Sequence, residues 1–295
     1  MPVDPAIVHA AVQQHMSWWQ ALIVGLVQGV TEWLPISSFG HVLLTLRAMG
    51  LGTDDPQSRK ATNALAVCLQ AGAIVAVIGL YRRRILQMIR GVLGIDPLGR
   101  RLVINVLVGF LPAGCIGYLF RNQIEAYLFN VPIMAGAWIV GGLAILAVTW
   151  MRGGRRGNRT GIDVDRLDWS KALIIGWVQC LALWPGTSRS LVTIVSGMVL
   201  GLTVASAVEF SFLLGLVTLG SAVAYKGYKS HHDILATYSV SNLVLAFGMA
   251  AVSAAITIRW LLSYIKRHSL AVFGYYRVVL GVVVTILLLI GALKH

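Results

Sequence analysis

The sequence predicts an all-α polytopic membrane protein that forms a single membrane domain over residues 1–295. Of the 295 residues, 57% are hydrophobic and only 12% are charged, whereas soluble globular proteins carry about 25% charged residues. The mean hydropathy is +0.78. Six apolar segments are long enough to cross a bilayer, and two more are interrupted near their middle. These observations indicate that lipid is the solvent of most of the chain.

A helix needs about 20 consecutive apolar residues to cross the hydrocarbon core of a bilayer. We expect transmembrane spans at residues 62–81, 103–120, 132–150, 207–227, 240–263 and 271–292. The basic residues gather in short loops between these spans, and no separate basic domain is present. The net charge of +13 is therefore interpreted as a signal of membrane topology, with no nucleic-acid partner.

Residues 17–49 and 171–201 are also apolar, but each is broken by proline and a run of Ser, Thr and Gly. The breaks run from Pro35 to His41 and from Pro185 to Ser190. Each half is too short to cross a bilayer, and irregular backbone at membrane depth is tolerated only where protein or a wet cavity covers it. We therefore expect two re-entrant helix-loop-helix hairpins.

The two broken segments resemble each other, which predicts an inverted repeat. Residues 24–28 (VGLVQ) match 175–179 (IGWVQ), and residues 33–38 (WLPISS) resemble 183–188 (LWPGTS) with a one-residue slip. Each half would consist of one hairpin followed by three spans, and paired interruptions of this kind point to a site near the bilayer midplane. The expected halves are residues 17–150 and 171–292.

The distribution of basic residues predicts the orientation of the chain. Fourteen of the 24 lysines and arginines fall in loops on one side, at residues 82–101, 151–171 and 264–270. The positive-inside rule makes this side cytoplasmic. Both termini then lie outside, and the hairpin that carries the first break enters from outside.

Acidic residues inside apolar segments are costly and therefore indicate function. Glu32 lies three residues before Pro35, and Gln28 lies four residues earlier, on the same helix face. Ser38 and His41 follow within the first break. A hydroxyl, an imidazole and a carboxylate so close together are typical of an activated-hydroxyl site, so we expect Glu32, Ser38 and His41 to be catalytic.

The second break carries the costly cation Arg189, whose guanidinium fork suits phosphate oxygens. Helices that begin after each break would direct their positive dipole ends at the same place. The alternative is a purely structural ion pair between Arg189 and Glu32. Further expected substrate contacts come from hydroxyls and backbone N–H groups at Ser37, Gly40, Gly186, Thr187, Ser188, Ser190 and Thr193.

Four other polar residues in the spans carry weaker signals. Gln70 and Glu209 lie near the start of the span after each hairpin, where each would either line the cavity or form an interhelical hydrogen bond. Arg259 and Arg277 lie near span ends, so we expect both side chains to extend to the membrane surface.

Residues 28–41 (QGVTEWLPISSFGH) and 185–190 (PGTSRS) resemble the two signature motifs of the bacterial undecaprenyl-diphosphatase, or bacitracin-resistance, family. Residues 207–214 (AVEFSFLL) are similar to the stretch that follows the second motif. The resemblance extends over about residues 17–292. It implies an inverted-repeat fold in the bacterial cytoplasmic membrane, with two re-entrant hairpins, and hydrolysis of undecaprenyl diphosphate. The orientation derived from the basic loops makes us expect that the active site faces outside.

The resemblance also implies roles for individual residues. The first motif has Glu or Gln and then Glu four residues later, which correspond to Gln28 and Glu32. The proposed nucleophile falls on Ser38 and the motif histidine on His41. The phosphate-binding arginine falls on Arg189, and Thr193 follows the second motif. Divalent metal dependence is a trait of this family. Because Glu32 is the only deep carboxylate, Mg²⁺ or Ca²⁺ would bind mainly through substrate phosphates and water.

Two departures place bulky residues beside the expected phosphate loops, Phe39 and Leu191, where the family has small residues. The alternative function is a transporter or flippase of a polyprenyl phosphate, because broken helices in an inverted repeat are transporter architecture. The expected partners are the polyprenyl diphosphate lipid and the bilayer, and a homodimer remains open.

Overall fold

The computed structural model describes residues 16–52, 56–128, 131–153 and 161–291. These residues fold into helices, and the one β-bridge among them joins Ile162 and Leu202. Six helices in this part of the chain are long and apolar enough to cross a membrane, as the sequence predicts. The prediction of a polytopic all-α membrane protein is confirmed.

The six candidate spans agree with the predicted ranges, with differences at their ends. The first consists of α4 (Pro56–Cys68) and α5 (Gln70–Leu80), which are interrupted at Leu69. Their combined candidate span is Ser58–Leu80. The others are α7 (Pro97–Leu119), α9 (Val131–Met151), α12 (Val204–Thr237), α13 (Val240–Ile265) and α14 (Ala271–Leu289).

The segment expected as an arginine-rich loop contains a helix of its own, α6 (Arg82–Val92). It packs against the start of α7, where Gly91 and Gly99 allow the two backbones to approach closely; a methyl group on Gly99 would lie 2.0 Å from the carbonyl oxygen of Gln87. The remaining short elements are α8 (Arg121–Leu128) and η2 (Val164–Arg166).

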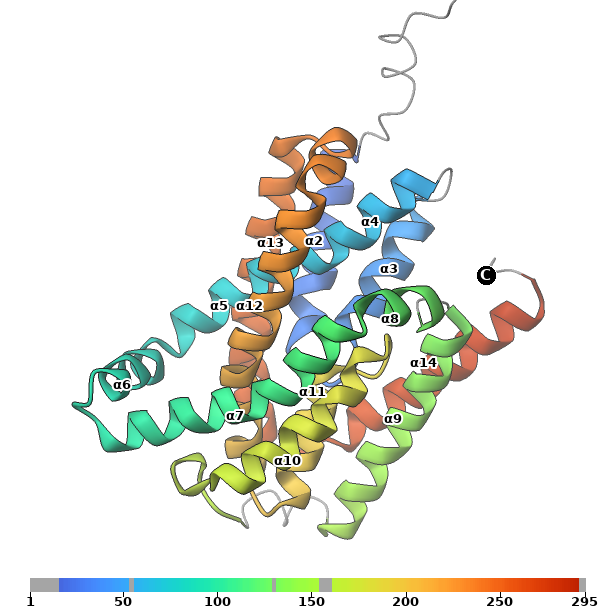
Figure 1. The fold of residues 1–295 in the computed structure, drawn as a ribbon. Helices are drawn as coiled ribbons and strands as arrows, with labels where there is room; N and C mark the ends of the chain where they lie inside the picture. The colour runs from blue at the N-terminus through green and yellow to red at the C-terminus, as the bar shows by residue number, and fades with distance from the viewer. Residues whose placement is uncertain (1–15, 53–55, 129–130, 154–160, 292–295) are drawn as a thin grey trace, which may run out of the picture.

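Both interrupted segments fold as two short helices joined by a break (Figure 1). The first contains α2 (Trp18–Glu32) and α3 (Ser38–Ala48), and the second contains α10 (Trp169–Gln179), η3 (Cys180–Leu183) and α11 (Arg189–Val199). An 11-residue helix is about 16 Å long, roughly half the thickness of the hydrocarbon core. None of these helices is long enough to span alone.

The breaks are shorter than the sequence suggested. Helix α3 already begins at Ser38, so His41 lies in its first turn, and Arg189 is the first residue of α11. The residue before each helix has a left-handed backbone, with φ of 77° at Ser37 and 73° at Ser188. Each break ends at this serine, and the polar residues that follow are helical.

The two segments correspond at a constant spacing of 151 residues, from 18 to 169, from 37 to 188 and from 38 to 189. The predicted one-residue slip is therefore wrong. It came from matching Pro35 with Pro185, whereas the left-handed serines place Pro35 opposite Gly186. Backbone conformation, and not the position of proline, sets the correspondence.

Each interrupted segment packs on a span of the other expected half (Figure 1). Helix α2 lies against α13, where a methyl group on Gly25 would be 2.3 Å from the carbonyl oxygen of Ala246. Helix α10 lies against α7, where a methyl group on Gly176 would be 2.4 Å from that of Gly109. Gly25 and Gly176 are again 151 residues apart, so equivalent glycines make equivalent close crossings.

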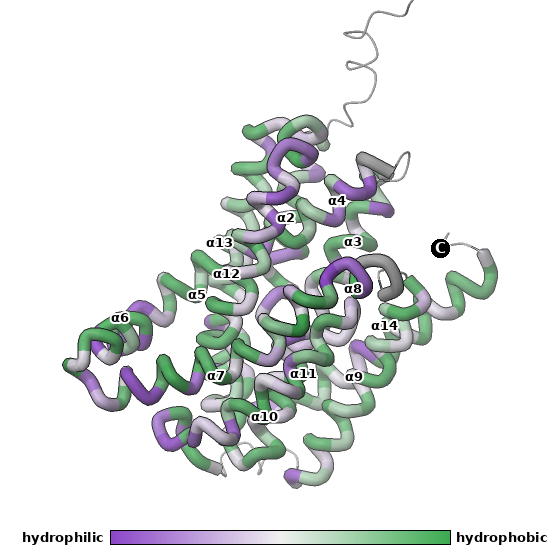
Figure 2. Tube along the Cα trace, in the orientation of Figure 1, coloured by the Kyte–Doolittle hydropathy of each residue, from purple (hydrophilic) through white to green (hydrophobic). Residues whose placement is uncertain are grey.

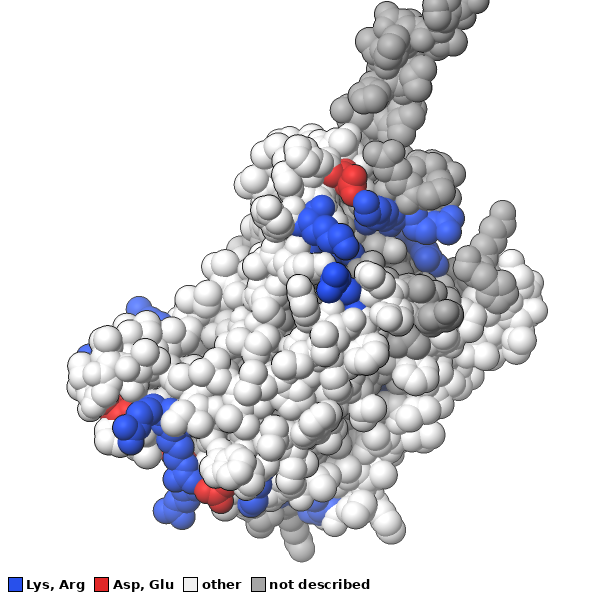
Figure 3. Space-filling model, viewed as in Figure 1, with Lys and Arg blue, Asp and Glu red and all other residues white. Residues whose placement is uncertain are grey.

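The surface has the polarity of a membrane protein. On the face shown in Figure 3, Lys and Arg gather at two ends, around α4, α8 and the C-terminal part of α12, and around α6, α7 and α10. A nearly uncharged zone lies between them, and the spans there are mostly hydrophobic (Figure 2). Large apolar side chains such as Leu111, Val140 and Val252 are more than half exposed, as expected for residues that face lipid.

Candidate active site

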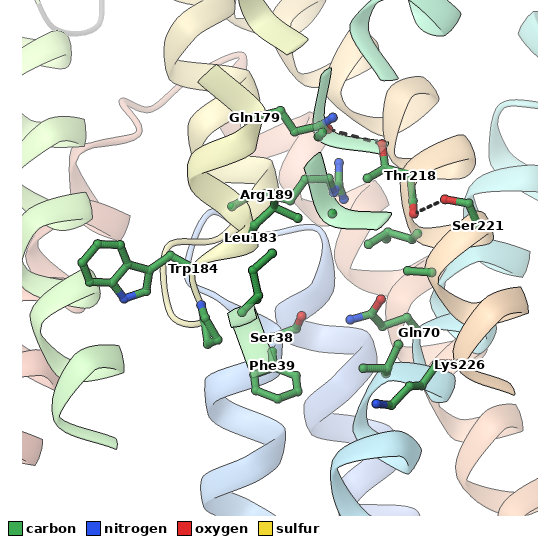
Figure 4. A pocket seen from close by; sticks show the side chains of 18 of the residues that line it. Ser38, Phe39, Gln70, Gln179, Leu183, Trp184, Arg189, Thr218, Ser221 and Lys226 are labelled. Atoms are coloured by element: carbon green, nitrogen blue, oxygen red, sulfur yellow. Dashed lines mark hydrogen bonds between the residues drawn. The ribbon is translucent and has the colours of Figure 1, made fainter. Parts of the chain in front are cut away.

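A cavity of about 780 Å³ lies where the two breaks meet spans α4, α5, α7 and α12. This volume is typical of small-molecule sites. In Figure 4, the side chains of Ser38, Arg189, Gln70 and Thr218 surround this space, and each comes from a different helix. The predicted site residues that line it are Glu32, Ser37, Ser38, Gln70, Gly186, Ser188, Arg189 and Ser190.

The Glu32 carboxylate ends α2 and accepts two hydrogen bonds on one oxygen. Gln28 Nε2 donates to Oε2 at 2.7 Å, and Ser38 Oγ donates to the same atom at 2.6 Å. All three side chains are buried. The spacing of four residues places Gln28 one turn before Glu32 on the same face, and the break then brings Ser38 back beside the carboxylate. The arrangement holds the serine hydroxyl against a potential proton acceptor.

The Arg189 guanidinium approaches this group from the second break. Its Nη2 atom lies 3.9 Å from Glu32 Oε1, which is close for an ion pair but too long for a hydrogen bond. Nη1 donates to the backbone oxygen of Ser211 at 2.7 Å, and the guanidinium lies 5.0 Å from the ring of Trp33. Nε and Nη2 are buried without a hydrogen-bond partner among the described residues. In a purely structural ion pair, Glu32 would be expected to accept hydrogen bonds from these donors. Because it does not, the two donors are available to bind an anion.

The hydroxyls around Arg189 are mostly used to fix the second break. Ser188 Oγ accepts from Leu191 N at 3.3 Å, which caps α11. Ser190 Oγ donates to Leu34 O at 2.9 Å and so ties the second break to the first. Thr193 Oγ1 donates to Arg189 O at 2.8 Å. Thr193, Thr187 and Gln28 are outside the cavity lining.

The expected group of Glu32, Ser38 and His41 is only partly assembled. Glu32 and Ser38 are in contact, but His41 is outside the cavity lining. Its ring nitrogens lie 2.7 Å from Ser37 O and 2.7 Å from Tyr276 Oη. The histidine therefore joins the first break to α14. Its closeness to Glu32 and Ser38 in sequence did not show that its side chain points towards α14.

The expectation that Arg277 extends to the membrane surface is wrong. Its side chain is 0% exposed, and its guanidinium donates to the backbone oxygens of Pro35, Ala137 and Gly186. Arg259, the other arginine of this expectation, is exposed. Position near a span end was the signal for both residues, and it does not distinguish a lipid-facing side chain from one that faces the breaks.

Glu209 does not line the cavity; it forms part of an ionic network far along α12 from the cavity-lining residues of that helix. Arg84 Nε lies 2.6 Å from Glu209 Oε1, and Arg84 Nη1 lies 3.0 Å from Asp165 Oδ1. Partial burial disfavours the charged guanidinium, but the two carboxylates outweigh this and raise the pKa of Arg84 above its ordinary value. The network joins α6, η2 and α12.

The cavity has basic residues at one end that the sequence analysis did not identify as site residues. Arg59, Lys60, Arg121 and Lys226 all contribute to its lining. Arg121 lies over the Tyr118 ring at 4.8 Å, and Lys60 pairs with Asp233 at 3.0 Å. Gln179 and Thr218, hydrogen-bonded at 3.3 Å (Figure 4), were also missed. For Gln179, its match with Gln28 in the two similar segments was the sequence feature that could have identified it.

The residues present offer a divalent cation limited coordination. The described part of the chain holds no group of three or more His, Cys, Asp or Glu residues in metal-binding proximity. Among the described residues, Glu32 is the one carboxylate of the cavity lining, and its Oε1 accepts no hydrogen bond from them. A hard cation bound through one carboxylate, substrate phosphates and water fits this arrangement.

Comparisons with known proteins agree over nearly the whole chain. The family model described as bacitracin resistance protein BacA matches residues 21–283. An undecaprenyl-diphosphatase of Methylococcus capsulatus is 41% identical over 267 residues, 90% of this chain and 93% of that protein. Undecaprenyl-diphosphatase 2 of Shewanella oneidensis is 38% identical over 266 residues, covering 90% and 96%. The chain therefore belongs to the bacitracin resistance protein BacA family.

Proposed function

We propose that the protein hydrolyses undecaprenyl diphosphate to undecaprenyl phosphate and inorganic phosphate, and so recycles the lipid carrier of cell-wall synthesis. The observation that carries this proposal is the cavity in which Ser38 contacts Glu32 while Arg189 retains two donors without partners. Relatives that share about two fifths of the sequence are named undecaprenyl-diphosphatases. The site and the names point to the same reaction.

Positioning and electrostatic stabilisation supply most of the catalysis in phosphoryl transfer. The Nε and Nη2 donors of Arg189 bind the oxygens of the terminal phosphate. Helices α3 and α11 begin at Ser38 and Arg189, so their positive dipole ends face the same phosphate. These groups neutralise the charge that develops on the phosphoryl oxygens.

Glu32 is the proton acceptor that the geometry favours, because its Oε2 atom is 2.6 Å from Ser38 Oγ. Either Ser38 or a water molecule at its hydroxyl attacks the terminal phosphorus, and the phosphoanhydride bond breaks to release the lipid monophosphate. In the first route, water then hydrolyses a phosphoserine. His41 supports the first break through Ser37 O, and no hydrogen bond among the described residues joins its ring to the Ser38 hydroxyl.

A divalent cation, Mg²⁺ or Ca²⁺, belongs to this proposal. Glu32 would hold it together with the substrate phosphates, and the cation would supply neutralisation of the diphosphate charge. Chelation with EDTA is then expected to abolish phosphate release, and added Mg²⁺ or Ca²⁺ to restore it. Full turnover in EDTA would remove the cation from the proposal.

We propose that the cavity opens to the outside and that both termini lie there. The basic end of the cavity contains residues of α4, α8 and the C-terminal part of α12, whereas α6 and the starts of α7 and α10 lie at the other end (Figure 1). The predicted cytoplasmic arginines belong to that other end. The constant spacing and the exchanged packing support an inverted repeat with two re-entrant hairpins.

Labelling tests this orientation. Cysteine introduced at Phe39, which lines the cavity, should react with an impermeant thiol reagent added from outside. Cys68, Cys115 and Cys180 are first replaced. Reaction only from the cytoplasmic side would overturn the orientation.

The activity itself is tested by phosphate release from purified protein and undecaprenyl diphosphate in detergent micelles. We expect turnover by the wild type and almost none by Arg189→Ala. A transporter remains the second candidate, because matched broken helices are typical of transporters. Transport of a polyprenyl phosphate across vesicles without phosphate release would favour the transporter and overturn the hydrolase.

A further inference from the structure

Arg277 is a fully buried cation that the proposed reaction does not use. It lies on α14 and is 0% exposed. In the part of the chain that the structure describes, it forms no ion pair with a carboxylate. Its hydrogen bonds all go to backbone oxygens. Burial of a charge is costly and normally needs a specific reason.

The acceptors of Arg277 supply that reason. Nη1 donates to Pro35 O at 3.4 Å, and Nη2 donates to Gly186 O at 3.0 Å. Each of these carbonyls belongs to the residue two positions before a left-handed serine, Ser37 or Ser188. With the spacing of 151 residues, Pro35 and Gly186 occupy equivalent places in the two breaks. The Arg277 guanidinium therefore contacts the equivalent carbonyl oxygen in each of the two breaks.

Helix α9 completes this arrangement. Nη2 also donates to Ala137 O at 2.8 Å, and Gly141, one turn further along α9, leaves room for the guanidinium. A methyl group on Gly141 would lie 2.4 Å from Nη2. Backbone carbonyls that lose their helical hydrogen bonds at a break have no water to bond with in an apolar surrounding. A planar fork with five donors satisfies several of them at fixed angles, which the point charge of lysine does not.

We propose that Arg277 is a positioning residue for the hydrolysis, because it fixes the two breaks relative to each other. The first break is followed by Ser38, and the second is followed by Arg189, so their separation sets the distance between the attacking hydroxyl and the phosphate-binding guanidinium. Arg277 acts through the carbonyls of Pro35 and Gly186 and makes no contact with substrate. This inference rests on the proposed function.

The principal test compares Arg277→Lys with the wild type. Lysine keeps the charge but loses the fork, so we expect kcat to fall about 10- to 100-fold, as is common when a supporting contact is lost, with KM within about threefold. Arg259→Lys, on the exposed face of α13, is the matched control and should behave as the wild type. An unchanged kcat in Arg277→Lys would overturn the inference.

Gly141→Ala provides a second variant that keeps every functional group. Alanine favours the helix of α9, while its methyl group displaces the Arg277 guanidinium. We expect kcat to fall without a lower melting temperature, whereas a purely stabilising role for Arg277 would lower the melting temperature and leave kcat unchanged. Gly136→Ala, on the same helix with no neighbour within 4 Å, is the control.

Hydrogen exchange measures the positioning without any turnover. In Arg277→Lys, amides of residues 33–37 and 184–188 should exchange faster together, while the amides of α6 remain unchanged. Faster exchange in only one break, or in neither, would overturn the inference. A wild type that releases no phosphate would overturn the proposed function instead, and the exchange result would still show whether Arg277 couples the two breaks.

Discussion

The substitution Gly215→Ala moves the Arg189 guanidinium without removing any polar group. Gly215 lies on α12, and a methyl group there would be 2.6 Å from Arg189 Nη1, 2.7 Å from Cζ and 2.9 Å from Nη2. Ordinary contact begins at 3.4 Å, so the guanidinium must retreat by about 0.8 Å, the difference between 3.4 and 2.6 Å. Such a shift breaks the 2.7 Å hydrogen bond to Ser211 O and turns the two free donors away from Glu32.

The magnitude follows from the bond that is lost. A hydrogen bond made by a charged group contributes about 1.5–3 kcal/mol, and each 1.36 kcal/mol is tenfold in rate. We therefore expect kcat/KM to fall roughly 10- to 100-fold. Folding is not expected to suffer, because the clash is with the end of a flexible side chain and alanine is better than glycine in a helix by about 0.8–1 kcal/mol.

The assay is phosphate release by purified protein, together with a thermal melt. Gly220→Ala, on the same helix with no atom within 4 Å, is the matched control for the change in helix propensity. Activity of Gly215→Ala equal to that of Gly220→Ala would refute the reasoning. A large fall in melting temperature in Gly215→Ala alone would also refute it, since the backbone and not the guanidinium would then have absorbed the clash.

Four further substitutions, grouped in three experiments, test other parts of the site. Arg189→Lys should lose most of its turnover, because a point charge cannot make the bidentate contact; near-normal kcat would contradict this. Ser38→Ala should abolish phosphate release, whereas Ser37→Ala should weaken it by about 1 kcal/mol, or roughly fivefold; equal effects in steady-state assays would contradict the special place of Ser38. Arg59→Gln should raise KM at low ionic strength, leave kcat unchanged and have little effect at high salt; a salt-independent effect would exclude attraction of the anionic substrate.

The sequence predicted the spans and the two breaks because both depend on local composition. A span needs only apolar length, and six segments have it. Proline with Ser, Thr and Gly cannot continue a helix easily, so the interruptions near Pro35 and Pro185 were recognisable. Glu32 and Arg189 were found because a charge in an apolar segment is rare and has to be accommodated.

The directions of side chains were not predictable in the same way. The sequence separation of His41 from Ser38 does not show whether the imidazole faces the Glu32 carboxylate or Tyr276. The packing of α3 beside α14 determines that it faces Tyr276. Arg277 and Arg259 both lie near span ends, yet one is fully buried and the other exposed. The difference depends on carbonyls contributed by residues more than 90 positions away in sequence.

The exchanged packing of the two halves has a consequence for biosynthesis. A chain enters the membrane from its N-terminus during translation, so α2 is inserted when α13, its partner through Gly25 and Ala246, has not yet been made. The glycine face of α2 must remain against lipid or a temporary protein partner until residue 246 emerges. The first half of the chain therefore cannot complete its packing in the bilayer until α13, the second-last helix, has been synthesised.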